Sequence, residues 1–286
     1  MAVNHLFAHS ASVDGALIAA GSPYGCGMEK DEEDRCYYGN VDIEQSVRWT
    51  WGRYAQNLID DPSNLNKVPV LLFNGKSDEC VYTRVMRDTF KTLQYFVDKD
   101  YLFRSFNTNA AHVWSLDHGQ CHCGACASLY GSLRCCDVNN CHYDLSGDLF
   151  GHRWTAGLWK FALVYVPTGC EARVLECRIH VNYHGCIRKR LKRRRLWATS
   201  IDLNEYAESN DIVVVYPQAA GSPRVGNGCW NWGDSKDDQY FDTRRSMQIG
   251  TVMNLLKNLP DALQDAELVD LSKDELTEGL NSSILV

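Results

Sequence analysis

The chain has 286 residues and the ordinary balance of a folded protein, with 45% hydrophobic and 23% charged side chains. These values exclude disordered and fibrous proteins, and the length fits one large α/β domain. The net charge of −7 argues against a nucleic-acid binder. No apolar run approaches the roughly 18 residues that span a bilayer, so we expect no membrane partner.

Apolar runs and helical patterns alternate along the first half of the chain. Buried strands are predicted for the runs 16–20, 68–73 and 102–106. Helices are predicted at 1–12, 42–59 and 81–97, with an acidic loop over 29–34. The first helix has no N-cap, so we expect it to begin upstream of Met1.

The second half continues this alternation after a loop at 119–142 that is rich in Cys and Gly. Strands are predicted at 161–166, 178–184 and 212–216, and helices at 200–209 and 245–258. The alternation indicates an α/β fold with a mostly parallel sheet and helices on both faces. Ligands of such sheets gather at the carboxyl ends of the strands, where Asp78, His112 and the turn 184–186 fall.

Cysteine usage indicates the compartment. The chain has 13 cysteines, most of them in loop-like contexts, which favours an oxidising environment outside the cell. The sequence opens without a basic region and a long apolar region, so it shows no signal peptide. We therefore expect the true N-terminus to be missing from the chain.

Asp78 and His112 stand in the order of the Asp and His of α/β-hydrolase triads, in which the Asp orients the His. The spacing alone is a weak signal. An Asp in a Gly-Lys-Ser-Asp turn is more often a turn former, and His118 competes with His112 as the base. The decisive partner is a nucleophile on a G-x-S-x-G elbow, and the sequence contains none.

Four segments together resemble the polyhydroxybutyrate depolymerase family, a circularly permuted type of α/β-hydrolase. They are 20–26 (Ala-Gly-Ser-Pro-Tyr-Gly-Cys), 139–144 (Asn-Asn-Cys-His-Tyr-Asp), 177–186 (Cys-Arg-Ile-His-Val-Asn-Tyr-His-Gly-Cys), and 215–218 (Val-Tyr-Pro-Gln) with 228–232 (Gly-Cys-Trp-Asn-Trp). The resemblance covers about 1–258. It implies residues 1–260 as an α/β-hydrolase-like catalytic domain that contains the Cys-rich loop 119–142. An acidic tail is expected at 261–286.

The resemblance assigns roles to individual residues. It implies that Asp78 is the triad Asp, that His112 is the general base, and that the backbone N–H of Cys186 donates to the oxyanion. It also implies that Trp230 flanks the substrate cleft, and we add Trp232 as a second aromatic residue there. The disulfides that it implies are Cys26–Cys36, Cys121–Cys141, Cys170–Cys177 and Cys186–Cys229.

The chain departs from the family at the nucleophile. Met1-Ala2-Val3 matches the helix start that follows the elbow in the family. We therefore expect the first strand and the nucleophile elbow to be missing, and the 286-residue chain to be inactive and unstable.

Three other sequence features leave alternatives open. The loop 119–142 contains a C-x-x-C pair and enough Cys and His for a structural zinc site, although disulfides are favoured. The run Arg188 to Arg195 has seven positive charges in eight positions, which fits a solvated helix face or a patch for polyanions such as nucleic acid. His180 and His184 share a strand face without a Glu, so a core or cleft role is favoured over metal binding.

The sequence thus predicts a secreted serine-type carboxylic ester hydrolase with no cofactor and no metal. Its expected partner is a polyester or a small ester substrate. The alternatives are a non-catalytic protein that binds polyester, polysaccharide or polyanion through its cleft, and a zinc-stapled interaction protein.

Overall fold

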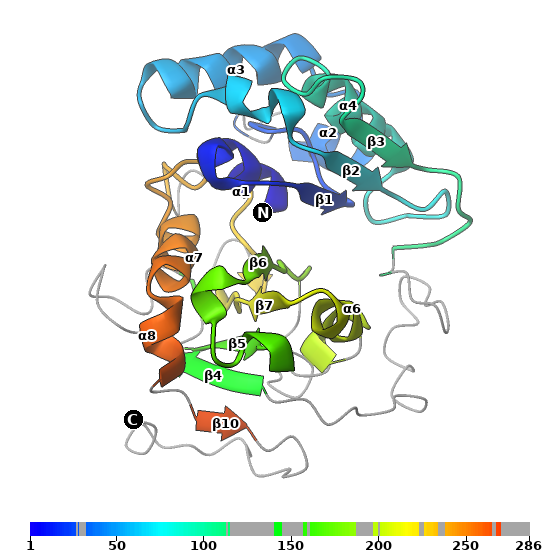
Figure 1. Cartoon of the computed structure of the whole chain (residues 1–286). Helices are drawn as coiled ribbons and strands as arrows, with labels where there is room; N and C mark the ends of the chain where they lie inside the picture. The colour runs from blue at the N-terminus through cyan, green and yellow to red at the C-terminus, as the bar shows by residue number, and fades with distance from the viewer. Residues whose placement is uncertain are drawn as a thin grey trace. The chain divides into compact units, whose positions relative to one another are not determined.

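Figure 1 shows a computed structural model of the chain. It describes residues 1–26, 28, 33–112, 114, 140–144, 157–158, 161–186, 197–199, 201–222, 226–233, 238–264 and 267–269. The chain divides into two compact units. Unit 1 comprises the described residues within Met1–Leu133, Gly221–Val225 and Trp230–Met253, and unit 2 comprises those within Arg134–Ala220, Gly226–Cys229 and Asn254–Val286.

Unit 1 is built on a three-stranded parallel sheet in the order β1-β2-β3. The strands are β1 (Ala16–Ala19), β2 (Val70–Phe73) and β3 (Leu102–Ser105). The helices of this unit are α1 (Ala2–Ala8), α2 (Glu33–Tyr38), α3 (Ile43–Ala55) and α4 (Thr83–Leu93), with short 3-10 helices at Ser10–Ser12 and Pro62–Lys67. Helix α3 begins where the Asp42 side chain accepts a hydrogen bond from the Gln45 N–H, an ordinary N-cap.

The core of unit 1 forms where aliphatic side chains of the sheet meet the helices. Ile18 and Leu72 pair across β1 and β2 and are buried, as are Leu6 and Phe7 of α1. The Phe7 ring lies 4.7 Å from the Tyr24 ring and 5.1 Å from the Phe96 ring, centroid to centroid. This packing fixes the sheet, and so the positions at which β2 and β3 end.

A buried ion pair joins α3 to the segment 238–246 within unit 1. Arg53 donates to both carboxylate oxygens of Asp242, at 2.9 and 3.2 Å, and Trp49 donates to Asp242 at 2.8 Å. The Tyr24 hydroxyl donates to the Asp242 carbonyl at 2.9 Å. Because every charged group in this cluster has partners, its burial is tolerated.

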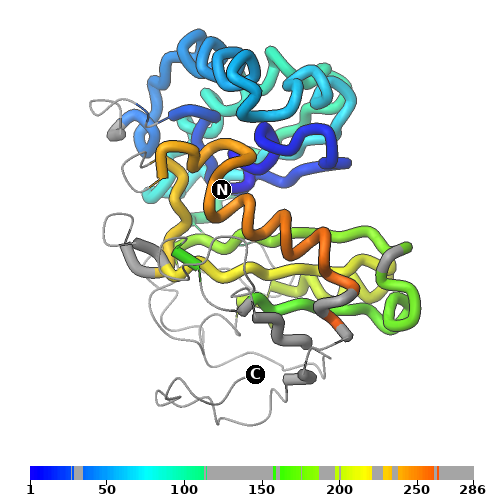
Figure 2. Tube along the Cα trace, turned by 90° about the vertical axis from the view of Figure 1, so that its left-hand side faces the viewer, coloured from blue at the N-terminus to red at the C-terminus, as the bar shows by residue number. Residues whose placement is uncertain are grey.

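Unit 2 contains a five-stranded sheet in the order β10-β4-β5-β7-β6. Its strands are β4 (Asn140–Asp144), β5 (Phe161–Tyr165), β6 (Arg178–Val181), β7 (Ile212–Tyr216) and β10 (Glu267–Val269). Only β6 and β7 pair in parallel, and the other three pairings are antiparallel. Figure 2 follows β5, β6 and β7 as neighbouring green and yellow tubes. Strand β7 is almost wholly buried, which suits its run of Ile, Val and Tyr.

The remaining elements complete unit 2. They are α6 (Leu203–Ser209), α8 (Leu259–Gln264) and the 3-10 helices Thr168–Cys170 and Val174–Glu176, while α7 (Met247–Lys257) begins in unit 1 and ends in unit 2. Two short strands, β8 (Gly221–Ser222) and β9 (Gly226–Asn227), lie outside both larger sheets.

No helix in the described part of the chain is long and apolar enough to cross a membrane.

The α/β class predicted from the sequence is confirmed, and the strands and helices predicted in unit 1 occur with shorter bounds. Several elements were not predicted. Among them, α2 begins inside the expected acidic loop, β4 overlaps the expected loop 119–142, α8 follows the last predicted helix, and β10 lies in the expected tail. Strand β4 is a short segment that pairs with β5 on one side and with β10, more than a hundred positions away in the sequence, on the other. Its pairing thus depends on the fold of the whole unit. The assignment of one domain over 1–260 and a tail over 261–286 stays a prediction.

Three disulfides lie within the described residues. They are Cys26–Cys36, Cys170–Cys177 and Cys186–Cys229, which are three of the pairs that the family resemblance implies. Cys80, which the resemblance leaves unpaired, is also disulfide-bonded. The proposed pair Cys121–Cys141 and the zinc alternative depend on residues and side chains outside the described part of the chain.

Candidate active site

Two turns meet at the carboxyl edge of the unit 1 sheet. One follows β2 and holds Asp78, and the other follows β3 and ends at His112. Backbone hydrogen bonds join the two turns: the Lys76 N–H donates to the Thr108 carbonyl at 2.9 Å, and the Ser77 N–H donates to the Ala110 carbonyl at 3.0 Å. Because β2 and β3 are parallel neighbours, the turns that follow them share one edge of the sheet.

Glycine at position 75 allows the turns to approach this closely. A Cβ atom placed on Gly75 would lie 1.9 Å from the Ala110 carbonyl oxygen and 2.5 Å from its carbon. Both atoms belong to backbone, which cannot rotate away as a flexible side chain can. Only a residue without a side chain therefore fits between the turns.

The Asp78 carboxylate lies at the centre of this arrangement and is almost wholly buried, with 3% of the side chain exposed. Its Oδ1 accepts the N–H groups of Cys80, at 2.9 Å, and Val81, at 2.8 Å. Its Oδ2 accepts the Asn74 side-chain amide at 3.0 Å and faces His112 Nδ1 at 2.9 Å. Each oxygen thus has two donors, which satisfies a buried anion.

These contacts set the charge state of Asp78. Burial raises the pKa of its carboxyl group. Hydrogen bonds and charge attraction from His112, with the backbone N–H groups of Val81 and Cys80, lower that pKa by more, so the net pKa lies below the ordinary aspartate value. Asp78 is therefore an anion near neutral pH and attracts a positive charge on His112.

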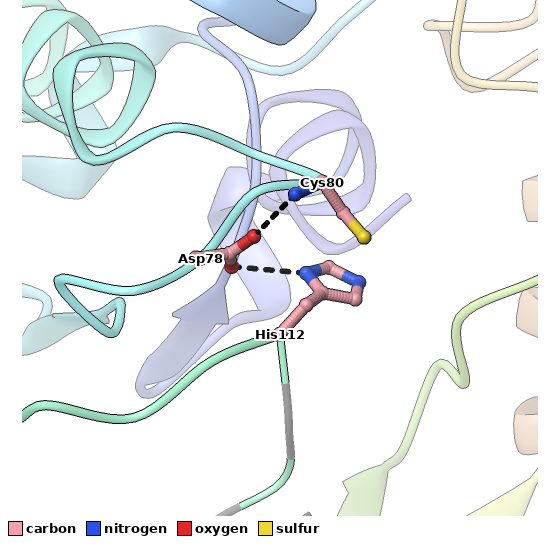
Figure 3. A group of neighbouring side chains, drawn as sticks. All are labelled: Asp78, Cys80 and His112. Atoms are coloured by element: carbon pink, nitrogen blue, oxygen red, sulfur yellow. Dashed lines mark hydrogen bonds and ion pairs between the residues drawn. The ribbon is translucent and has the colours of Figure 1, made fainter. Parts of the chain in front are cut away.

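His112 has the geometry of a base that a carboxylate orients. Figure 3 shows the imidazole with Nδ1 toward Asp78 and Nε2 on the opposite side of the ring. An ionised carboxylate only accepts hydrogen bonds, so the proton of the neutral imidazole resides on Nδ1 and the lone pair on Nε2. Nε2 has no hydrogen-bond partner among the described residues, and 40% of the side chain is exposed. It is therefore available to take a proton from another molecule or group.

Asp78, Cys80 and His112 also offer three potential metal-ligand atoms within 4.8 Å of one another. Figure 3 draws all three side chains together. Cys80, however, is disulfide-bonded, so it provides no thiolate for a metal ion. The donor set that remains, one carboxylate and one imidazole bonded to each other, suits proton transfer better than metal coordination.

The turn 184–186 lies in unit 2 and was expected to hold the oxyanion donor. His184 Nδ1 donates to the Gly185 carbonyl, and His184 Nε2 accepts the Ala219 N–H at 3.1 Å. Cys186 is exposed and is joined to Cys229 by a disulfide. The turn is thus held by one buried imidazole and one disulfide, and the oxyanion role of the Cys186 N–H stays a prediction.

The two tryptophans expected at the substrate cleft both lie in unit 1. Trp230 is buried, with 4% exposed, whereas Trp232 is half-buried and its ring meets Tyr37 edge-on at 5.3 Å. Their cleft role stays a prediction. His118 and the basic run Arg188 to Arg195 lie outside the described residues.

Sequence analysis missed two contributors to this site. The sequence pattern assigns no role to Asn74 and places Tyr82 only within the helix predicted at 81–97. In the structure the Tyr82 N–H donates to the Tyr37 carbonyl at 3.2 Å, and this bond joins α2 to the segment between Asp78 and α4. The polar residue directly after the β2 run was the signal that pointed to Asn74.

Comparison with known proteins gives relatives of one kind, although no family model matches the chain. A poly(3-hydroxybutyrate) depolymerase from Delftia acidovorans is 26% identical over 296 residues, which cover 91% of this chain and 56% of that protein. A polyhydroxybutyrate depolymerase from Talaromyces funiculosus is 23% identical over 281 residues, which cover 84% of this chain and 80% of the relative. The chain thus spans about half of the length of the bacterial relative.

Solved structures show the same fold. The PHB depolymerase from Penicillium funiculosum aligns with a TM-score of 0.73 and 22% identity, over 89% of this chain and 90% of that one. A PHB depolymerase with a serine-to-alanine substitution, complexed with an R3HB trimer, aligns with the same TM-score and 21% identity. By sequence similarity over most of its length and by its fold, the chain is similar to the polyhydroxybutyrate depolymerases.

Proposed function

We propose that the chain carries the acid–base pair of a serine-type carboxylic ester hydrolase that acts on polyesters of 3-hydroxybutyrate. The observation that carries the proposal is the buried Asp78 carboxylate bonded to His112 Nδ1 at 2.9 Å, in turns that follow adjacent parallel strands. This pair has the geometry that a serine hydrolase needs in order to activate its nucleophile.

In the proposed reaction, His112 Nε2 takes the proton from a serine hydroxyl as the serine oxygen attacks the ester carbonyl carbon. Asp78 holds the imidazole in the required tautomer and stabilises the imidazolium that forms. His112 then gives the proton to the leaving alcohol, which completes the acyl-enzyme. In the second half, water takes the place of serine, and His112 again removes and returns one proton.

Stabilisation of the tetrahedral oxyanion is assigned to backbone N–H groups. The Cys186 N–H is the proposed donor from this chain, in the turn that His184 and the Cys186–Cys229 disulfide hold. Donors fixed before the reaction are worth more than mobile ones because they need no reorganisation when charge develops.

The nucleophile is the element that the 286 residues do not supply, because they contain no G-x-S-x-G elbow. Without it no acyl-enzyme forms, and only binding and oxyanion stabilisation remain. We therefore expect the 286-residue chain by itself to be inactive toward esters.

Substrate class and compartment follow from the same features. One structural neighbour is described as complexed with an R3HB trimer, which supports a polyester of this hydroxy acid as the substrate here. Three described disulfides and the disulfide-bonded Cys80 favour an oxidising, extracellular compartment.

The test compares the 286-residue chain with a longer version in which a strand and a G-x-S-x-G turn are joined ahead of α1. A matched control carries alanine in place of the added serine. Hydrolysis of p-nitrophenyl butyrate and of 3-hydroxybutyrate trimer is measured for each folded protein. We expect turnover only from the longer serine version. Equal turnover by the alanine control would contradict the proposal.

A second candidate function is non-catalytic binding of the polyester. Exposed aromatic rings favour it: Tyr37 and Tyr38 of α2 and Tyr82 are 37%, 55% and 39% exposed. The Tyr38 and Tyr82 rings lie 5.5 Å apart. Retention of the 286-residue chain on polyhydroxybutyrate particles, with no turnover by the longer version, would favour this alternative.

A further inference from the structure

Asn74 is a buried polar residue that contacts the Asp78 carboxylate at Oδ2, whereas the backbone N–H groups of Cys80 and Val81 contact Oδ1. It is 1% exposed and directly follows β2. Its backbone N–H donates to the Ser105 carbonyl at 3.1 Å, which extends the pairing of β2 with β3 by one bond. Its side chain is thereby held at the edge of the sheet where the two turns meet.

The orientation of the Asn74 amide is fixed by two acceptors. The Nδ2 group donates to Asp78 Oδ2 at 3.0 Å and to the Val81 carbonyl at 3.2 Å. A flipped amide would place Oδ1 against two groups that only accept hydrogen bonds, so this assignment is the sole one that fits.

This orientation leaves the other end of the amide unsatisfied. Asn74 Oδ1 is buried and has no hydrogen-bond partner among the residues that the structure describes. An unpaired buried acceptor is destabilising, and a residue that only filled space would avoid it. A buried polar atom without a partner is expected mainly at functional sites, where the function rather than stability selects the residue.

We infer that Asn74 is a positioning residue, which locks the Asp78 carboxylate so that Oδ2 receives His112 Nδ1 and the imidazole keeps its lone pair on Nε2. The backbone N–H groups of Cys80 and Val81 hold only Oδ1. Asn74 holds Oδ2, the oxygen that His112 uses, and so opposes rotation of the carboxylate about its bond to Cβ. The catalytic meaning of this role rests on the proposed function, whereas the geometry does not.

The test is the tautomer of His112 in the full chain labelled with ¹⁵N-histidine, read from ¹H–¹⁵N correlation spectra at neutral pH. Asn74→Leu removes both donors at similar volume. We expect the wild type to show the Nδ1–H tautomer and Asn74→Leu to lose its predominance. Asn74→Ala removes the same donors without a branched side chain, and the same loss is expected if the Leu variant does not fold.

Asn204→Leu is the matched control. Asn204 is a buried asparagine of unit 2 whose amide donates to the Ala198 carbonyl at 2.9 Å. Its replacement should leave the His112 tautomer unchanged. Retention of the wild-type tautomer in the folded Asn74 variants would overturn the inference, and so would an equal change in Asn204→Leu.

The measurement needs no substrate and no nucleophile, so it separates the two proposals. If the His112 tautomer changes in the Asn74 variants while the longer, serine-bearing version of the chain shows no ester turnover, the positioning role is supported and the ester hydrolase is contradicted. If the His112 tautomer is unchanged in the Asn74 variants while ester turnover requires His112, the positioning role is contradicted and the ester hydrolase is supported.

Discussion

Two histidines near strand ends, His112 in unit 1 and His184 in unit 2, have contrasting surroundings. His112 bonds the Asp78 carboxylate through Nδ1 and has a side chain that is 40% exposed. His184 is 3% exposed, donates from Nδ1 to the Gly185 carbonyl and accepts the Ala219 N–H on Nε2. The first imidazole has a neighbouring anion and an accessible lone pair, whereas both ring nitrogens of the second are hydrogen-bonded to backbone groups.

The contrast shows that partners, not residue type, decide what a histidine can do. A carboxylate on Nδ1 stabilises the charged ring, so His112 can gain and lose a proton at Nε2. A backbone N–H on Nε2 requires the neutral ring, so His184 would lose that bond if protonated. We expect His112 to act in proton transfer and His184 to hold a turn.

The largest effect should come from His112→Ala in the longer, serine-bearing version. Loss of the general base should lower kcat for p-nitrophenyl butyrate by at least about 10³-fold, because positioned acid–base groups contribute on that order. The unfolding midpoint should fall modestly, because Asp78 Oδ2 loses one of its two donors while the His112 side chain itself is partly exposed. Unchanged turnover in the His112→Ala protein would contradict the assignment of His112, in contrast to His184, to proton transfer.

Gly75→Ala should have the largest effect on stability. Its Cβ would meet the Ala110 carbonyl, so we expect a loss of about 3 kcal/mol, at the upper end of overpacking costs. Gly52→Ala is the control, because a Cβ there meets nothing within 4 Å and Ala suits the interior of α3. Urea unfolding of both variants checks this, and equal stability in the two would refute the close approach of the turns.

His184→Ala should destabilise the chain by about 2 kcal/mol, because it leaves the buried Ala219 N–H without its acceptor. The measurement is the free energy of unfolding in urea. His112→Ala serves as the comparison, with a smaller expected loss. A larger loss from His112→Ala than from His184→Ala would reverse the assignment of roles.

The smallest effect concerns acid stability. Because the pKa of Asp78 is lowered in the folded state, its contribution to stability is present above its unfolded pKa near 3.8. That contribution is lost as the pH falls through the lower folded pKa. The difference in unfolding midpoint between wild type and Asp78→Asn should therefore shrink as the pH falls below about 4. A difference that grows as the pH falls through that range would contradict the sign of this pKa shift.

The parts of the site that the sequence predicted are those with a local signal. Asp78 and His112 each follow an apolar run, and parallel strands bring such ends together. The fit of Gly75 against Ala110 and the contact of Asn74 with Val81 carry no such signal, because they depend on how two turns meet. The strands β4 and β10 were not predicted because they also depend on contacts between distant segments: their pairing joins residues more than a hundred positions apart.

The most direct test of the central claim follows both histidines in one experiment. The folded chain is treated with diethyl pyrocarbonate, which acylates accessible lone pairs of imidazole rings, and the modified histidines are identified by mass spectrometry. We expect His112, with an exposed side chain and a free lone pair on Nε2, to be modified, and the buried His184, whose Nε2 accepts the Ala219 N–H, to be protected. Protection of His112, or modification of His184 in the folded chain, would contradict the account.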